Sequence, residues 1–189
     1  MTAPVCFPDI VNLTAASCSA LSIRDSSTRS GMYYINPQGL SSYPLVQVYC
    51  NMTSKDGVGV TEIGHDHESR TLVVGYESQN CEQFIKYECR GSSFRNAGGH
   101  YSWWISRQGS KMNYWGGAAV NSSECACGMI DTCAGGGKCN CDVNDYTWRE
   151  DSGYLTDKNT LPVTELRFGD TGGQGEKGYH TLEKLRCWG

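Results

Sequence analysis

The sequence predicts an α+β fold that is rich in strands, stapled by disulfides and supplied with few short helices. Short runs of β-branched and aromatic residues recur along the 189 residues, and clusters of Gly, Ser, Asn and Pro separate them. Eleven cysteines and 23 glycines accompany only 39% hydrophobic residues. This composition suits a domain whose loops are held by covalent bridges, although the length still allows a substantial core.

Eight segments favour strands. The first two, MYYI at 32–35 and PLVQVYC at 44–50, flank the turn-forming residues NPQGLSSYP. Short helices are expected within 15–24 and 66–72. The remaining strand segments are 71–76, 81–89, 101–106, 111–117, 164–170 and 182–189.

The chain is expected to form one domain over 18–189, preceded by a leader or linker at 1–17. Within it, 18–53 would form an N-terminal subdomain. Residues 54–189 would form a central sheet that carries a cysteine-rich loop region at 119–145. The opening residues lack the charged and apolar regions of a signal peptide. We therefore expect the chain to be a segment taken from a longer exported protein.

The densest group of cysteines lies in residues 124–142. Cys125 and Cys127 are separated by one residue, as are Cys139 and Cys141, so neither pair closes easily on itself. Four thiolates in this order could hold a tetrahedral Zn²⁺. Structural zinc sites more often use two-residue gaps, however, and the sequence context favours a disulfide knot.

The other cysteines give clearer pairing rules. If 81–89 is one strand, Cys81 and Cys89 lie about 26 Å apart at roughly 3.3 Å per residue, so each needs a different partner. Cys18 and Cys50 enclose a strand–turn–strand unit and form the most natural bridge of the N-terminal half. Because a terminal cysteine commonly ties the last strand to its sheet, Cys187 is expected to pair with Cys81 or Cys89.

Eleven is an odd number, so at least one thiol lacks a partner inside the chain. Cys6, in a proline-flanked leader, is the best candidate. It could link a preceding module or a second chain, and a disulfide-linked or non-covalent homo-oligomer is therefore one hypothesis. The other ten cysteines are expected to form disulfides: Cys18, Cys50, Cys81, Cys89, Cys125, Cys127, Cys133, Cys139, Cys141 and Cys187.

Three N-glycosylation sequons, at Asn12, Asn51 and Asn121, agree with a secretory route. The chain is thus predicted to be secreted or to be the extracellular part of a cell-surface protein. A net charge of −4 gives no basic footprint for nucleic acid. No apolar run approaches the roughly 18–20 residues that span a bilayer, so no membrane insertion is expected.

At this point the residues resemble a family. CSALSIRDSSTRSGMYYINPQG with YPLVQVYCNMT (18–53) is similar to the opening of fibrinogen-like C-terminal domains, and collagen C-propeptides begin similarly. CEQFIKYECR, YSWWISRQGSKMNYWGG, the CACG–C–CNCD block and the closing LRCWG resemble the fibrinogen-like module of contactin-associated, neurexin-like proteins. Ficolin-type fibrinogen-related proteins are more distant. The resemblance covers 18–189 and implies a two-part fibrinogen-like fold with a Cys18–Cys50 bridge.

The resemblance also implies a non-catalytic extracellular recognition module in cell adhesion or pattern recognition. EDSGYL (150–155) has a superficial likeness to a serine-protease stretch, but no matching His motif accompanies it. Three hypotheses remain: protein-directed adhesion, a calcium-assisted lectin for acetylated sugars in innate immunity, and an assembly module like the collagen C-propeptide. The expected partner is an extracellular protein or glycan. No cofactor is required.

Candidate ligand-binding residues are aromatic, because indole and phenol rings stack on sugars or apolar groups while their polar edges form hydrogen bonds. Core packing is the competing interpretation for most of them. Loops near 92–100, 118–145 and 170–180 would carry the binding face. The aromatic candidates are Tyr101, Trp104, Trp115, Tyr146 and Trp148.

Calcium is the metal ion for which the acidic loop residues offer a candidate ligand set. Ca²⁺ takes six to eight oxygen ligands, and Asp142, Asn144, Asp145 and Asp151 could supply some of them. Ordinary turn residues are the competing interpretation. HDHE at 65–68 places two His residues on one side of an extended segment, where they could form a weak transition-metal site. A solvated loop is the favoured interpretation there.

Overall fold

The computed structural model describes residues 14–39, 45–64 and 78–189. The chain divides into two compact units: the first holds the chain up to Glu62 with Trp188 and Gly189, and the second holds Ile63–Cys187. Five of the sequence predictions lie outside the described residues. They are Cys6, the sequon at Asn12, the HDHE motif, the helix at 66–72 and the strand at 71–76.

The first unit combines one α-helix with an antiparallel sheet in the order β1–β2–β3. The side chain of Ser17 caps the helix by accepting a hydrogen bond from the amide of Ala20. Val46, Val48 and Cys50 alternate with exposed residues, as expected for a strand with one buried face. The elements are α1 (Cys18–Arg24), β1 (Gly31–Ile35), β2 (Val46–Asn51) and β3 (Val60–Ile63), whose last residue belongs to the second unit.

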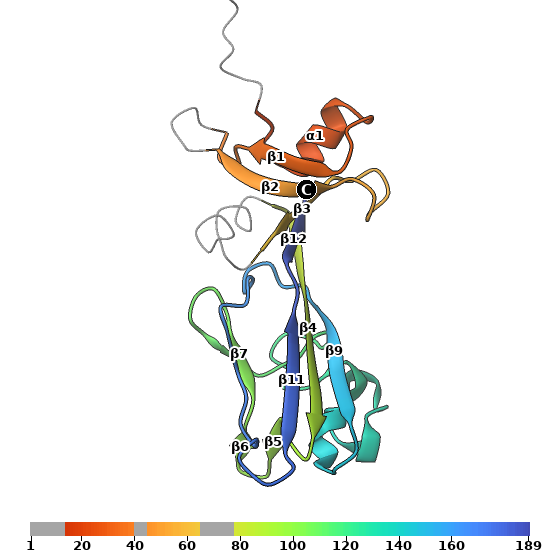
Figure 1. The fold of residues 1–189 in the computed structure, drawn as a ribbon, viewed down its shortest axis with the longest axis vertical. Coiled ribbons are helices and arrows are strands. Elements are labelled where there is room, and N and C mark those ends of the chain that lie inside the picture. Colours follow the sequence, from red (N-terminus) through yellow and green to blue (C-terminus); the bar gives the residue numbers. More distant parts are fainter. Residues whose placement is uncertain (1–13, 40–44, 65–77) are drawn as a thin grey trace, which may run out of the picture. The chain divides into compact units, whose positions relative to one another are not determined.

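The second unit is built around β4 (Asn80–Arg90), an eleven-residue strand in which every second residue is buried. β9 (Arg149–Leu155) pairs with β4 antiparallel. β11 (Lys177–Leu182) also pairs with β4. β12 (Leu185–Trp188) follows β11 in the chain and is likewise a neighbour of β4 in the sheet (Figure 1). β4 is therefore the central strand of this sheet.

Smaller elements complete the second unit. A three-stranded sheet has the order β10–β7–β8, and a separate short hairpin pairs β5 with β6. The cysteine-rich region forms single 3₁₀ turns rather than longer helices. These elements are β5 (Arg95–Asn96), β6 (Gly99–His100), β7 (Trp103–Ile105), β8 (Lys111–Met112), β10 (Glu165–Arg167), η1 (Ala126–Ile130), η2 (Ala134–Gly136) and η3 (Asn140–Val143).

Aromatic rings fill the space behind β4. Tyr87 stacks on Phe168 with centroids 4.3 Å apart and also contacts Phe94. Phe94 packs against Trp115 at 4.8 Å. Such ring contacts contribute roughly 0.5–1.5 kcal/mol each beyond simple burial. The core of the second unit is therefore aromatic, and the opposite face of β4 is left for other side chains.

Ten cysteines form five disulfides, so the structure is a β-rich, disulfide-stapled domain with one described α-helix. Cys18 pairs with Cys50, as predicted. Cys187 pairs with Cys81, one of the two partners expected for it. The three remaining pairs are Cys89–Cys141, Cys125–Cys139 and Cys127–Cys133. No pair closes within a CxC group, as the spacing required.

Candidate functional site

Two of the predicted ligand-binding residues are core residues. Trp104 is fully buried and its Nε1–H donates to the carbonyl of Tyr114 at 2.7 Å. Trp115 is 3% exposed, and its Nε1–H donates to the carbonyl of Asp151 at 2.9 Å. With faces and polar edge already engaged, neither ring can reach a ligand. The prediction that Trp104 and Trp115 bind a ligand was wrong, and the competing core interpretation holds for both.

Two of the three remaining aromatic candidates, Tyr146 and Trp148, are exposed. Trp148 directly precedes β9, is 48% exposed, and stacks on Tyr179 of β11 with centroids 5.5 Å apart and an interplanar angle of 20°. Tyr179 is 59% exposed. Since Tyr179 lies opposite Glu88, both rings lie on the side of the sheet away from the core. We call the surface formed by Tyr146, Trp148, Tyr179, Arg90 and Lys177 the aromatic face.

Backbone glycines seat the Tyr146 ring. A Cβ added at Gly91 or Gly175 would come within 3.0 or 3.1 Å of that ring, and both glycines have positive φ. The guanidinium of Arg90 lies 5.4 Å from the ring centroid and donates to the carbonyls of Tyr146 and Gly175. Tyr146 is thus held in place while its outer side stays open to solvent. Tyr101, the remaining aromatic candidate, is half-buried and bonded to Asn96.

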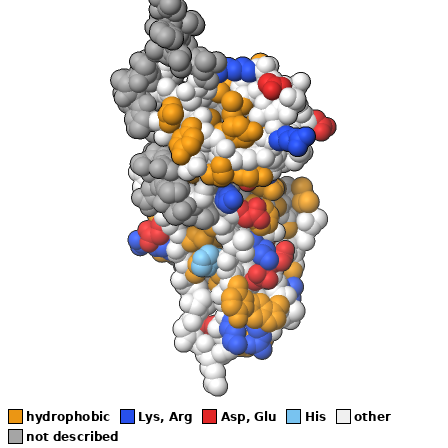
Figure 2. Space-filling view, turned by 45° about the horizontal axis from the view of Figure 1, so that its top comes forward, with side chains coloured by type: hydrophobic (Ala, Val, Ile, Leu, Met, Phe, Trp, Pro, Cys, Tyr) orange, Lys and Arg blue, Asp and Glu red, His pale blue; other side chains and the backbone are white. Residues whose placement is uncertain are grey.

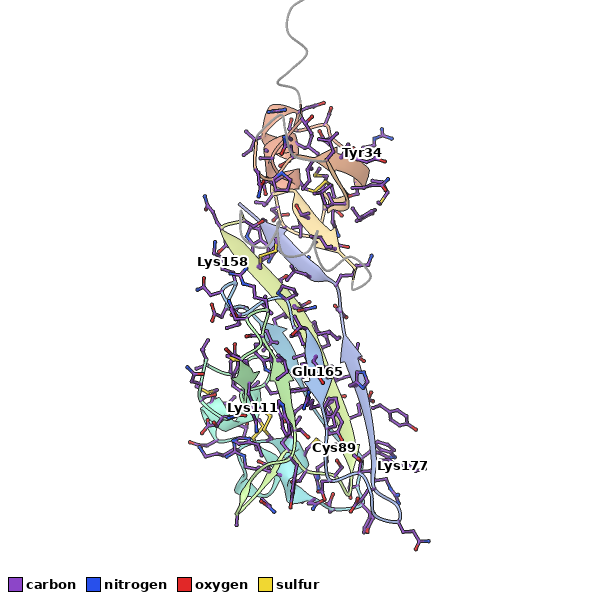
Figure 3. The ribbon with its side chains drawn as sticks, turned by 90° about the vertical axis from the view of Figure 1, so that its left-hand side faces the viewer. Tyr34, Cys89, Lys111, Lys158, Glu165 and Lys177 are labelled. Carbon is purple, nitrogen blue, oxygen red and sulfur yellow. A yellow bond between two sulfur atoms is a disulfide. The ribbon has the colours of Figure 1, made fainter. Side chains whose placement is uncertain are left out.

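Charged side chains border the aromatic face on the same side of the sheet. Lys86 lies 3.1 Å from Glu88 and 4.0 Å from Glu150, and such half-exposed pairs contribute little to stability. Lys177 has no ion-pair partner among the described residues. Figure 2 shows hydrophobic side chains beside basic ones near the lower end of the face that it presents. In Figure 3, Cys89 and Lys177 mark the end of β4 and the start of β11.

The predicted calcium ligands do not fit a calcium site. Both carboxylate oxygens of Asp151 accept backbone N–H groups, from Asn140 and Cys141. Asp145 is engaged by the guanidinium of Arg149 at 2.7 Å. Among the described residues, the one group of His, Cys, Asp or Glu donors close enough for a metal is Cys125, Cys139 and Asp151. Its two cysteines form a disulfide and offer no thiolate.

The other two members of the calcium set also have structural roles. Asn144 ends η3 in the left-handed conformation, with φ of 52°. The carboxylate of Asp142 accepts the amide of Cys139 at 3.1 Å and lies 3.6 Å from the guanidinium of Arg95. Burial raises the pKa of Asp142, and Arg95 and backbone N–H groups oppose this shift. These residues build the loop rather than assemble an oxygen cage.

Asp151 is the residue that joins the cysteine-rich loop to the sheet. It is 3% exposed, lies opposite Tyr87 in the β4–β9 pairing, and binds the first amides of η3. Burial raises the pKa of its carboxyl, and the two N–H bonds oppose this shift. The Cys89–Cys141 bridge fixes η3 to β4 covalently. Trp148, between η3 and β9, therefore projects from a backbone anchored on both sides.

Two sequons lie within the described residues. Asn121 is exposed in a turn with φ of 61°. Asn51 is half-buried at the end of β2, and its Nδ2 donates to Glu62 Oε1 at 2.9 Å. The atom that would carry a glycan is engaged at Asn51, whereas Asn121 is exposed and no described residue is recorded as bonding to its side chain. Separately, no described helix is long and apolar enough to cross a membrane.

Sequence comparison relates the chain to one group of proteins. No protein-family model matches it. It is 31% identical to Contactin-associated protein 1 of Rattus norvegicus over 98% of its length, and 30% identical to the Homo sapiens protein over the same share. Neurexin-4 of Drosophila melanogaster is 35% identical over 75% of the chain. The chain is homologous to a segment of these proteins. It spans 16% of the length of the first two relatives and 14% of the third.

Proposed function

We propose that the chain is a non-catalytic extracellular recognition module of the contactin-associated, fibrinogen-like type, and that its aromatic face binds a protein partner in cell adhesion. The observation that carries this proposal is the stacked pair of Trp148 and Tyr179, which is about half exposed on the face of the sheet opposite the buried aromatic core. Large exposed rings at a fixed position are typical of the residues that dominate binding energy at interfaces.

The surroundings of the pair suit a protein interface. Arg90 and Lys177, which has no ion-pair partner within the described ranges, lie at one end of the aromatic face. Lys86, Glu88 and Glu150 lie further along the sheet. An apolar centre with a charged border is the usual anatomy of such a surface. The five disulfides fit an oxidising extracellular location, in a secreted or a surface-anchored protein. The homology to contactin-associated proteins supports the same role.

Glycan binding is the second candidate, and a specific observation favours it. The exposed indole and phenol rings present faces on which a sugar ring could stack, with Arg90 and Lys177 beside them as hydrogen-bond donors. The calcium-assisted form of this hypothesis gains no support from the geometry of Asp142, Asn144, Asp145 and Asp151. An assembly role through Cys6 stays a prediction.

The test is a binding screen of the intact, oxidised chain. It would be probed against an array of cell-surface ectodomains, contactins first because the name of a relative records that association, and against a glycan array with calcium and with chelator. Every hit is repeated with Trp148→Ala and with Tyr34→Ala. Tyr34 lies in β1 of the first unit and is as exposed as Tyr179, at 59%.

Loss of a hit with Trp148→Ala and its retention with Tyr34→Ala is the expected result. A protein hit selects the adhesion hypothesis, and a glycan hit selects the lectin hypothesis. Equal binding by the wild type and Trp148→Ala would show that the partner binds elsewhere than on the aromatic face. Blank arrays with intact disulfides would count against recognition of either kind.

A further inference from the structure

Among the described residues, no strand lies beside the outer edge of β11. β4 occupies one side of β11, and the described residues supply no strand for the other side. All residues from Lys177 to Thr181 are exposed. Edges of this kind offer a row of backbone donors and acceptors, and proteins usually protect them. An unprotected edge beside the aromatic face is therefore a candidate binding element.

The pairing register identifies the backbone groups that face outward. The amide of Glu183 donates to the carbonyl of its opposite residue, Phe84, at 3.0 Å. In an antiparallel ladder the hydrogen-bonded pairs recur at every second residue, so Lys177, Tyr179 and Thr181 also direct their backbone groups to β4. Gly178 and His180 then direct theirs to the open edge. No described residue bonds to them there.

A groove runs along this edge. Two adjoining hollows of about 360 and 580 Å³ both include His180 in their walls. The wall opposite β11 is formed by Thr164, Glu165 and Leu166 in one hollow and by Phe168 in the other. Because the groove has two walls, it suits a single chain segment better than the broad surface of a second folded copy.

We propose that the edge of β11 binds an extended peptide segment of a partner protein as an added antiparallel strand. This inference rests on the proposed recognition function and adds the class of partner. The peptide residue opposite His180, here called p, exchanges two backbone hydrogen bonds with it. Its side chain faces Leu166 and Phe168, so an apolar residue fits there. The residue three positions later lies opposite Lys177, whose exposed ammonium favours Asp or Glu.

The probe is a displayed library of random ten-residue peptides, sorted on the intact 189-residue chain. The expected result is enrichment of an apolar residue followed three positions later by Asp or Glu. Lys177→Glu, an exposed substitution, should shift the enriched residue at that position to Lys or Arg. An empty selection, or one without this pattern, overturns the proposal.

Selected peptides are then synthesised and measured against two variants of one residue. His180→Pro removes the outward N–H and places a ring on the edge, whereas His180→Ala keeps the backbone donor. Binding should weaken by about tenfold or more with His180→Pro and by less than about threefold with His180→Ala. Equal affinity for both variants contradicts strand addition.

A change in the peptide tests the same bonds without altering the protein. N-methylation at p should abolish binding because that N–H bonds to His180, while N-methylation at p+1, whose N–H points away, should not. A dimer of the free chain that His180→Pro abolishes would show instead that a second copy occupies the edge. Partner binding lost in Trp148→Ala but kept in His180→Pro would leave the proposed function standing and refute strand addition.

Discussion

Removing the Cys89–Cys141 bridge should cost much more stability than removing Cys127–Cys133. The perturbation is a pair of double substitutions to Ala. Cross-linking stabilises mainly by restricting the unfolded chain, and the effect grows with the length of the closed loop. The two bridges close loops with sequence separations of 52 and 6 residues. The loop-entropy relation then gives about 4 kcal/mol for the first and about 2 kcal/mol for the second.

The assay is urea unfolding of the oxidised chain followed by far-ultraviolet circular dichroism, with the remaining four bridges verified by mass. At a slope of about 2 kcal/mol per M, the difference between the variants corresponds to about 1 M in the midpoint. Cys89 and Cys141 are only 2% and 1% exposed, so replacing them with Ala also removes buried contacts and lowers the stability of that variant further. Equal midpoints, or a lower midpoint for the Cys127–Cys133 variant, would refute the reasoning that this long loop is held through β4.

Three further predictions concern single residues. Trp104→Ala should lower the free energy of unfolding by about 3–5 kcal/mol because the ring is fully buried, and Trp148→Ala by about 1 kcal/mol or less; similar urea midpoints for the two variants would contradict the burial argument. The pKa of Asp151 in the folded chain lies above its ordinary value of 3.8. Between these two pKa values the folded chain therefore binds more protons than the unfolded chain. The free energy of unfolding of the wild type, relative to that of Asp151→Asn, should therefore rise as the pH falls toward 3.8. A relative stability that falls over this range would contradict the raised pKa. Expression in mammalian cells should load Asn121 more fully than Asn51, as glycosidase-sensitive peptide masses would report; the opposite order would contradict the exposure argument.

The strands with clean alternation could be predicted from the sequence. β1, β2 and β4 lie where β-branched and aromatic residues recur at every second position, and each boundary falls within two residues of the prediction. β7, β8 and β10 occupy only parts of the predicted segments, because each is limited by short pairing partners. Local pattern was sufficient where one face of the strand is buried.

β9 and β11 could not be predicted in the same way. β9 reads REDSGYL, and β11 begins within the segment 170–180, where the sequence predicts a loop. Neither sequence shows a clear strand pattern. Each segment is extended because it pairs with β4, which the local sequence does not reveal. Gly178 has a reason that only the structure reveals: a Cβ there would meet the Tyr87 hydroxyl at 2.2 Å.

The candidate site was predicted in part. Tyr146 and Trp148, which the sequence offers as ligand-binding candidates, are exposed. Tyr179, which completes the stack, lies in β11, most of which falls outside the predicted strand segments. Adjacent tryptophans in a strand face opposite sides, and here Trp104 is the buried one while Trp103 lies under the ammonium of Lys111 at 3.9 Å. The sequence could not say which of the two would be buried. That choice depends on the sheet that packs against them.

If the aromatic face is a recognition surface, removing one of its rings must weaken binding more than removing an equally exposed ring elsewhere. The affinity of the intact chain for the partner found by the screen would be measured by surface plasmon resonance for Tyr179→Ala and Tyr34→Ala. Both side chains are 59% exposed, so each substitution removes a similar area of exposed side chain. We expect a loss of about 30-fold, or about 2 kcal/mol, for Tyr179→Ala and less than about threefold for Tyr34→Ala. Equal losses, or a loss confined to Tyr34→Ala, would contradict this expectation.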